Sequence, residues 1–240
     1  MNSRKTETVG TFTDHFSELR KRVIRCVIAI CAALAITIPL QKVWFAILYY
    51  PARKYIPTLQ YIEIHEGFMM YLNLSLLAAF LLALPVVIWQ TWKFVEPALY
   101  ERERQWVTRL SGVSLGLFWA GVMFAYWIII PIAIRFFTGF GSPTIEANIR
   151  LSNYLSFACF MLLITGLAFQ VPIVLVFLMW TGIVPRRVFT RNRRSVIVII
   201  LIFSAIFTPP DPVTMILLAA PFYMLFESSL LFVKLFVKKK

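Results

Sequence analysis

The sequence predicts an all-α polytopic membrane protein with six transmembrane helices. Of its 240 residues, 60% are apolar or aromatic and only 15% are charged, a balance far from that of globular domains. A water-soluble helix keeps one polar face, so helices without charge must be solvated by lipid or by other lipid-embedded helices. Six stretches contain no charged side chain, namely 26–41, 67–92, 110–134, 151–185, 195–210 and 212–226.

The charged residues fall mainly on one side of the predicted bundle. If the spans alternate in direction, residues 1–25, 93–109, 186–194 and the tail from Glu227 share one side, which holds 19 of the 24 Lys and Arg residues. An excess of Lys and Arg in short loops marks the cytoplasmic side. Both termini are therefore predicted in the cytoplasm, and the short loops favour a bacterial inner membrane. This orientation accounts for the net charge of +13 without nucleic acid as a partner.

The first span follows an amphipathic segment at 14–25. After that span, a short aromatic piece at 44–50 lies between Pro39 and Pro51. Seven residues cannot cross a bilayer, so we expect this piece at the outer interface. The loop up to Gly67 is expected to form a small cap.

The second and third spans carry features of helix packing. Pro85 lies inside the second span and removes one backbone hydrogen bond there. In the third span, Gly112, Gly116 and Ala120 recur every four residues on one face. This spacing permits another helix to approach closely, so we interpret it as a packing face.

The fourth uncharged run, 151–185, is too long for one perpendicular span, which predicts a tilt or a kink at Pro172. Its polar and small side chains fall within an arc of about 80° on a helical wheel. This stripe is therefore predicted to face protein or water rather than lipid. It consists of Ser152, Ser156, Cys159, Gly166 and Gln170.

The last two spans are predicted to be short. Only 16 residues separate Arg194 from Asp211, and only 15 separate Asp211 from Glu227. At 1.5 Å per residue each stretch covers about 23 Å, less than a hydrocarbon core of about 30 Å. Either the bilayer is thin beside them or a partner holds Glu227 at depth. The predicted single domain, 1–240, thus has spans at about 23–40, 68–92, 110–134, 152–180, 195–209 and 213–233.

The sequence offers no constellation for catalysis, metal binding or a cofactor. The histidines His15 and His65 are predicted on opposite faces of the membrane, and no Ser stands in a G-x-S-x-G context. There is no Gly-rich phosphate loop and no metal-ligand pair. We therefore predict neither enzyme activity nor a cofactor.

Two charged segments on the cytoplasmic side are candidates for binding. The loop FVEPALYERER, 94–104, alternates acidic and basic side chains where the next helix begins. The segment HFSELRKR, 15–22, places Glu18 four residues before Arg22. Taken alone, both segments are typical of solvated surfaces with weak ion pairs.

These two segments, together with GLAFQVPIVL at 166–175 and TPPDP at 208–212, resemble signatures of the TatC family. Members of that family are core receptor subunits of the twin-arginine protein translocase. The resemblance covers essentially the whole chain and implies a cupped bundle that binds Arg-Arg signal peptides of folded proteins at its cytoplasmic face. It also implies TatA- and TatB-like single-span partners, further TatC copies, and export driven by the proton-motive force.

The resemblance implies which residues bind the signal peptide. Glu103 and Glu18 correspond to the carboxylates that take the two arginines. A carboxylate accepts a guanidinium fork bidentately, a geometry that a lysine ammonium cannot match. The rest of that patch corresponds to Phe94, Leu99, Tyr100 and Arg104, with Leu19 and Arg20 from the N-terminal motif.

The chain departs from the family pattern at two membrane positions. Gln170 stands where the family commonly has Glu, so this side chain can hydrogen-bond but cannot titrate. In the polar patch that receives single-span partners, Thr208, Asp211 and Thr214 remain while Met215 replaces a Gln, which weakens or moves that contact. Structural roles are predicted for the prolines Pro51, Pro85, Pro97, Pro172 and Pro210.

A small-solute transporter or channel is the alternative function, with the fourth-span stripe ending at Gln170 as its polar path. No internal repeat relates the first three spans to the last three, which argues against an inverted-repeat transporter. A membrane enzyme is disfavoured because the sequence supplies no credible nucleophile–base pair.

Overall fold

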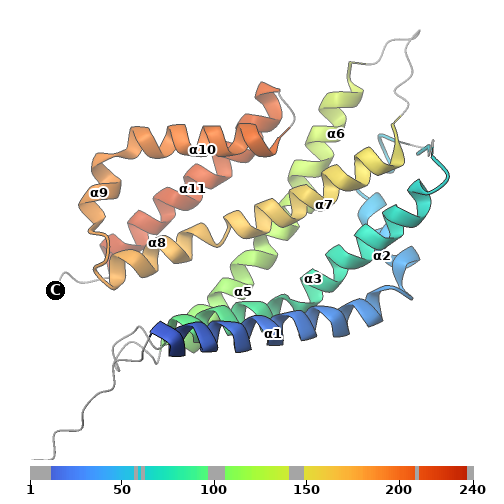
Figure 1. The fold of residues 1–240 in the computed structure, drawn as a ribbon. Helices are drawn as coiled ribbons and strands as arrows, with labels where there is room; N and C mark the ends of the chain where they lie inside the picture. Colours follow the sequence, from blue (N-terminus) through green and yellow to red (C-terminus); the bar gives the residue numbers. More distant parts are fainter. Residues whose placement is uncertain are drawn as a thin grey trace, which may run out of the picture.

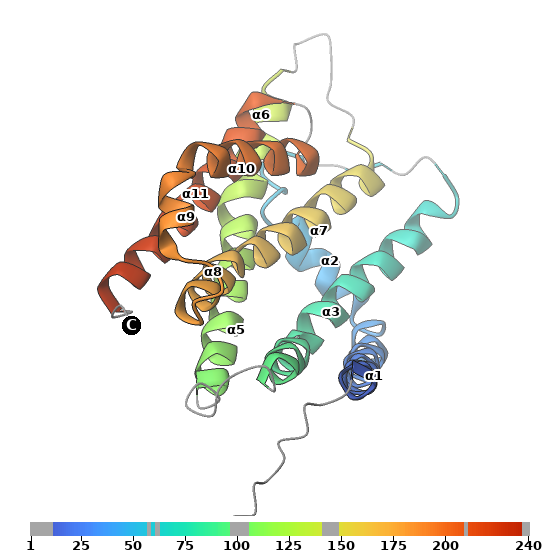
Figure 2. The same ribbon diagram turned by 60° about the vertical axis from the view of Figure 1, so that its left-hand side comes forward.

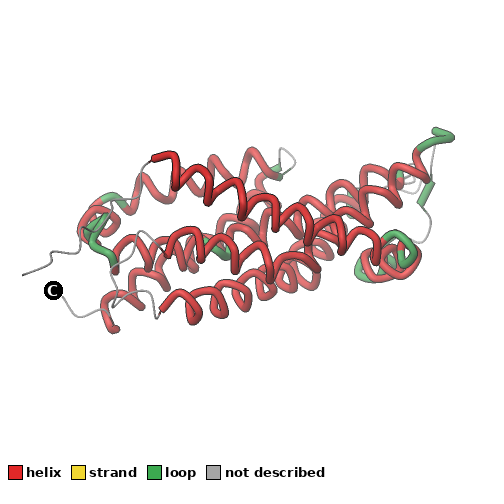
Figure 3. The backbone as a smooth tube through the Cα atoms, turned by 60° about the horizontal axis from the view of Figure 1, so that its bottom comes forward, coloured by secondary structure: helices red, strands yellow, loops and turns green. Residues whose placement is uncertain are grey.

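The structure is a computed structural model that describes residues 12–56, 59–60, 63–96, 106–140, 149–208 and 211–236. Within these ranges the chain is helical apart from short turns and one parallel bridge between Gln60 and Arg150. Most helices run roughly along the long direction of the bundle, and most connections between them lie near its two ends (Figures 1 and 3). The elements are α1 (Phe12–Thr37), α2 (Gln41–Tyr49), α3 (Glu66–Val95), α5 (Trp106–Phe124), the π-helix η2 (Ala125–Ile129), α6 (Ile130–Thr138), α7 (Leu151–Ala168), α8 (Val171–Trp180), α9 (Arg186–Arg191), α10 (Arg193–Phe207) and α11 (Pro212–Phe236).

Four helical stretches among the described residues are long and apolar enough to cross a membrane. They correspond to α3, to α5 with η2 and α6, to α7 with α8, and to α11. The pair α1 and α2 passes the same test together but bends by 88°, so it adds a fifth span if it is counted as one. The helical membrane class is therefore confirmed, while six spans and cytoplasmic termini remain predictions.

The helix α2 leaves α1 almost at a right angle, in the aromatic piece predicted at the interface. Two tyrosine hydroxyls hold its carbonyl end. Tyr126 Oη donates to the Ile47 carbonyl at 2.6 Å, and Tyr154 Oη donates to the Leu48 carbonyl at 2.6 Å. Because these donors come from η2 and α7, α2 is bound to both of these elements.

The helices α10 and α11 lie side by side (Figures 1 and 2). With 15 residues, α10 covers about 22 Å, in agreement with the uncharged run. The helix α11 has 25 residues and continues through Glu227 to Phe236. Arg193 Nη1 lies 3.2 Å from the Glu227 carboxylate and Tyr223 Oη donates to it at 3.0 Å. A partner therefore holds this acid, one of the two explanations that the sequence left open.

The close contact between α5 and α7 does not use the packing face predicted from Gly112, Gly116 and Ala120. Gly112 and Gly116 are exposed, and a Cβ added to either would meet nothing within 4 Å. At Gly121 an added Cβ would lie 2.8 Å from the Phe169 ring, and at Gly166 it would lie 2.8 Å from the Phe118 ring. Thus Phe118 of α5 lies over a glycine of α7, and Phe169, the residue that follows α7, lies over a glycine of α5. The sequence identified a face of small residues, but that face is not the packed one.

Prolines shape two further helices. Pro172 is the second residue of α8, and the fourth uncharged run breaks just before it, between Ala168 and Val171. Pro131 is the second residue of α6, which follows η2. Since proline has no N–H and clashes with the carbonyl four residues earlier, the chain widens into a π-turn over Ala125–Ile129. This widening directs Trp127 outward, with 57% of its surface exposed.

Candidate functional site

One end of the bundle gathers the beginning of α1, the end of α3 and the beginning of α5 (Figures 1 and 2). An apolar cluster around buried Trp92 and Ile173, with Val95 and Leu110 packed against it, joins the ends of α3, α5 and α8. Arg22 of α1 donates from Nη1 to Gln90 Oε1 of α3 at 3.3 Å. The start of α1 and the end of α3, which carry candidate residues, therefore lie at the same end of the bundle as the start of α5.

Glu18 is held in place, yet it is not fully satisfied. Arg22 lies one helical turn away and donates from Nε to Glu18 Oε1 at 3.1 Å, and its second nitrogen contacts the same oxygen. Among the described residues, none forms a hydrogen bond or an ion pair with the other carboxylate oxygen, Oε2. The side chain of Glu18 is 32% exposed and that of Arg22 is 14% exposed. Arg22 thus fixes the carboxylate and leaves one oxygen open.

The remaining candidates of this patch divide into two groups. Leu19 and Arg20 are exposed on α1 next to Glu18, and Phe94 is half-buried in the last turn of α3. The loop residues Pro97, Leu99, Tyr100, Glu103 and Arg104 lie outside the described residues.

Inside the bundle, Gln170 forms a clasp between α5 and the break that separates α7 from α8. Its Nε2 donates to the Ser114 carbonyl at 2.9 Å, and the Ser114 hydroxyl donates to its Oε1. Ser114 is buried. A charged carboxylate at this position could accept the second bond but could not donate the first. The neutral amide therefore suits this site better than an acid.

Replacing Gln170 by Leu and Ser114 by Ala, singly and together, should give a coupling energy of about 0.6–1.7 kcal/mol, the range found for interhelical hydrogen bonds in membranes. Unfolding of each variant in detergent by an SDS titration, followed by circular dichroism, measures this energy. The exposed Ser156 serves as control, because Ser156→Ala should not couple to Gln170→Leu. A coupling energy of zero would show that the clasp contributes nothing.

At the turn between α10 and α11, the polar side chains satisfy their own helices. Asp211 accepts the Thr214 backbone N–H at 2.7 Å and also the Thr214 hydroxyl, so it caps α11. Thr208 Oγ1 donates to the Ser204 carbonyl at 2.9 Å. Both threonines are buried and Met215 is half-buried, while Pro210 lies outside the described residues.

The opposite end of the bundle holds an ion cluster that the sequence did not reveal. The Glu66 side chain at the start of α3 is only 4% exposed. It accepts Arg150 Nε at 3.1 Å and the Ser152 backbone N–H at 2.9 Å, which caps α7. Glu63 pairs with Arg150 at 2.7 Å and with His65 at 3.1 Å. Hydrogen bonding to Glu63 and to Glu66 raises the pKa of the Arg150 guanidinium.

These features define a class: a multi-pass helical membrane protein whose candidate site is a surface at one end of the bundle. Among the described residues no group of three His, Cys, Asp or Glu side chains could hold a metal ion. Two members of the predicted polar stripe are used for packing, since Gly166 lies against Phe118 and Gln170 is bonded to Ser114. A solute path along it is therefore not favoured.

Comparison with known proteins identifies the family. The family model described as Sec-independent protein translocase protein (TatC) matches residues 14–221. The TatC protein of Desulforapulum autotrophicum is 37% identical over 98% of this chain and 88% of its own length, and that of Escherichia coli K12 is 31% identical over 94% and 88%. A crystal structure of the twin-arginine translocase receptor TatC superposes with a TM-score of 0.83 at 33% identity, covering 93% of this chain and all of the other.

The chain belongs to the TatC family. It is therefore a subunit of the Sec-independent protein translocase and a multi-pass protein of the inner membrane, and the family is not one of enzymes. The TatC resemblance carried by the four sequence motifs is confirmed.

Proposed function

We propose that this chain binds the Arg-Arg pair of signal peptides on folded proteins, with Glu103 and Glu18 as the ligands. The solved relative is named a twin-arginine translocase receptor. The observation that carries the proposal here is Glu18, a half-exposed carboxylate with one open oxygen beside exposed Leu19. The incoming guanidinium takes that oxygen while Arg22 keeps the other.

The flanking chain supports a contribution from Glu103. This residue lies between α3, which ends at Val95, and α5, which begins at Trp106. Both helix ends belong to the same end of the bundle as the start of α1, the helix that carries Glu18 (Figure 1). Two carboxylates from separate elements can each take one guanidinium, and the bidentate geometry of that pairing selects Arg over Lys. Phe94, Leu99, Tyr100, Arg20 and Arg104 complete the proposed binding surface.

We further propose that single-span partners of the TatA and TatB type dock beside the turn between α10 and α11. The hydroxyls of Thr208 and Thr214 bond within their own helices, so a docking helix finds mainly apolar contact at Met215.

Export is driven by the proton-motive force. Gln170 does not take part as a proton carrier, because an amide does not titrate.

A binding measurement tests the roles of the two acids. A fluorescent Arg-Arg peptide should bind Glu103→Gln about tenfold more weakly than the parent, since a charge-assisted hydrogen bond contributes about 1.5 kcal/mol. Glu18→Gln should weaken binding about threefold, because solvent screens a partly exposed group. Glu101→Gln removes the same charge two residues from Glu103 and should change little. Equal effects at positions 101 and 103 would contradict the assignment.

A further inference from the structure

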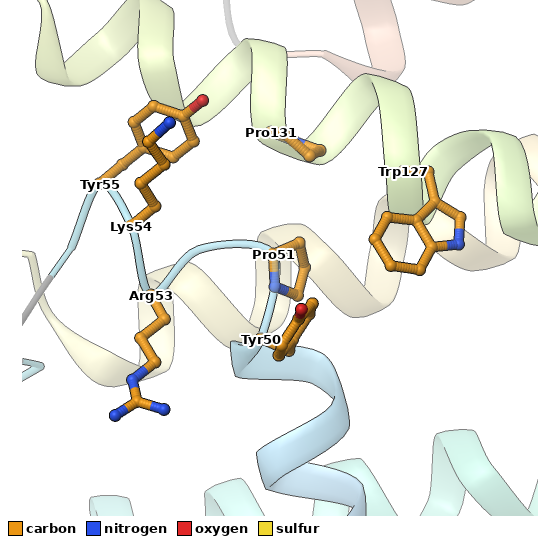
Figure 4. A pocket seen from close by; sticks show the side chains of 7 residues that line it. All are labelled: Tyr50, Pro51, Arg53, Lys54, Tyr55, Trp127 and Pro131. Carbon is orange, nitrogen blue, oxygen red and sulfur yellow. The ribbon is translucent and has the colours of Figure 1, made fainter.

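A pocket lies where the segment after α2 faces η2 and α6, at the end of the bundle away from the start of α1. Its volume is about 460 Å³, within the range of about 300–1,000 Å³ that holds small ligands. Figure 4 shows Tyr50, Pro51 and Trp127 along one part of the wall, with Lys54 beside Tyr55 at another. The lining residues are Tyr50, Pro51, Arg53, Lys54, Tyr55, Trp127 and Pro131.

The wall of this pocket is fixed before any ligand arrives. Tyr126 Oη holds the end of α2, and Tyr49 Oη donates to the Ile56 carbonyl at 2.5 Å, closing the turn that carries the two cations. Pro51 and Ala52 in that turn are buried. Tyr50 and Trp127 meet edge to face with centroids 6.3 Å apart. π-helical turns such as the one that presents Trp127 occur often at functional sites.

The two cations of the pocket have no acidic partner among the described residues. Arg53 and Lys54 are both exposed, and the described acids nearest in sequence, Glu63 and Glu66, are engaged by Arg150. Cations beside tyrosine and tryptophan mark the headgroup level of a membrane. A ligand that suits this combination carries negative charge and an apolar part.

An exposed apolar track leads from the pocket along α5. Trp127 and Met123 are 57% and 54% exposed. Ala120 and Gly116 continue the track, and nothing lies within 4 Å of a Cβ added at Gly116. From Trp127 to Gly116 the rise is about 16 Å, close to half of a hydrocarbon core of about 30 Å. One acyl chain of one leaflet fits this length.

We propose that the pocket is a binding site for an anionic phospholipid. The headgroup phosphate contacts Lys54, and Arg53, whose side chain extends the opposite way from the same turn (Figure 4), adds positive charge beside it. The glycerol region packs between Tyr50 and Trp127, and an acyl chain follows α5 toward Gly116. With the orientation that the charge distribution predicts, this lipid belongs to the outer leaflet. The bound lipid anchors the turn after α2 to η2, so it stabilises the cap at the end opposite the proposed signal-peptide site.

Native mass spectrometry of the purified full chain tests this site. The protein is incubated with equal amounts of phosphatidylglycerol and phosphatidylcholine that carry the same acyl chains. We expect phosphatidylglycerol to be retained at least tenfold better, since each cation near a membrane surface contributes about fivefold. In Arg53→Gln/Lys54→Gln this preference should disappear.

A matched control uses another lysine at the same end of the molecule. Lys42 is exposed on α2 and does not line the pocket, so Lys42→Gln should keep the preference while Lys54→Gln lowers it about fivefold. Equal losses in these two variants would overturn the site. Displacement of the lipid by millimolar inorganic phosphate would also overturn it, because it would show a simple anion site.

A second measurement identifies the occupant in membranes. A photoreactive benzoylphenylalanine in place of Trp127, in vesicles that contain phosphatidylglycerol and the purified protein, should yield adducts with the mass of one phospholipid. Arg53→Gln/Lys54→Gln in the same background should lose the phosphatidylglycerol adduct. An adduct with a second copy of the chain as the main product would overturn the proposal, since a protein would then fill the pocket.

Discussion

Replacing Glu66 by alanine is expected to lower the free energy of unfolding by about 3 kcal/mol, the lower part of the range for breaking a buried ion pair. The carboxylate is 4% exposed and joins three parts of the chain. It begins α3, pairs with Arg150 across 84 residues of sequence, and caps α7 at the Ser152 N–H. The loss of unfolding free energy should not reach the upper part of that range. Arg150 is 31% exposed and would keep its ion pair with Glu63.

Glu63→Ala is the matched control for this prediction. Glu63 contacts the same arginine, at 2.7 Å, but its side chain is 50% exposed, so its removal should cost at most about 1 kcal/mol. An SDS titration in detergent micelles, followed by circular dichroism, measures both variants. Similar losses for the two acids would show that burial of Glu66 does not make it the anchor of this end of the bundle.

Gly121→Leu should also lower the free energy of unfolding by about 3 kcal/mol. This is the upper part of the usual range for overpacking a core. An added Cβ lies 2.9 Å from the Thr165 backbone carbonyl as well as 2.8 Å from the Phe169 ring. The ring could rotate away, but the carbonyl belongs to α7 and cannot move alone. The helices α5 and α7 would have to separate.

Gly116→Leu tests whether the effect comes from packing or from loss of glycine in a helix. Gly116 lies on α5 as well, is exposed, and has nothing within 4 Å of an added Cβ. Its replacement should be neutral or slightly stabilising, since leucine favours helix over glycine by up to about 1 kcal/mol. Thermal unfolding in detergent compares the two variants. A large loss at Gly116 would contradict the described face of contact.

Absence of charge was enough to locate the long spans. The run 67–92 lies within α3. The fourth run breaks just before Pro172, because proline has no backbone N–H to donate to the preceding turn. These features depend on local chemistry, which a single stretch of sequence contains. The short α10 follows from the same reasoning, since Arg194 and Asp211 lie near its two ends.

Features that depend on distant partners could not be predicted from such patterns. Charge was taken to end a span, yet α3 begins at Glu66 and α11 continues past Glu227, because Arg150 and Arg193 compensate these acids. Periodicity likewise showed that α5 has a face of small residues. It could not show that the packed glycine is Gly121 on another face, since this depends on where α7 lies.

Sequence motifs were enough to predict which residues of the candidate site carry its chemistry. Glu18 and Leu19 belong to the start of α1, which lies at the end of the bundle where α3 ends. The open oxygen of Glu18, however, depends on Arg22 being held by Gln90 of another helix. The Gln170 clasp also required a partner, Ser114, 56 residues away. Motifs supply the chemistry of such a site, and tertiary contacts decide which atoms remain available.

The most direct test of the account is site-specific photocrosslinking from position 101, two residues from the proposed ligand Glu103, in membranes that contain the protein. Two signal peptides are compared that differ only in Arg-Arg against Lys-Lys. We predict efficient capture of the Arg-Arg peptide and little capture of its Lys-Lys twin. Glu18→Gln should reduce this preference. Equal capture of both peptides would contradict the proposal that carboxylates at this face select paired guanidinium groups.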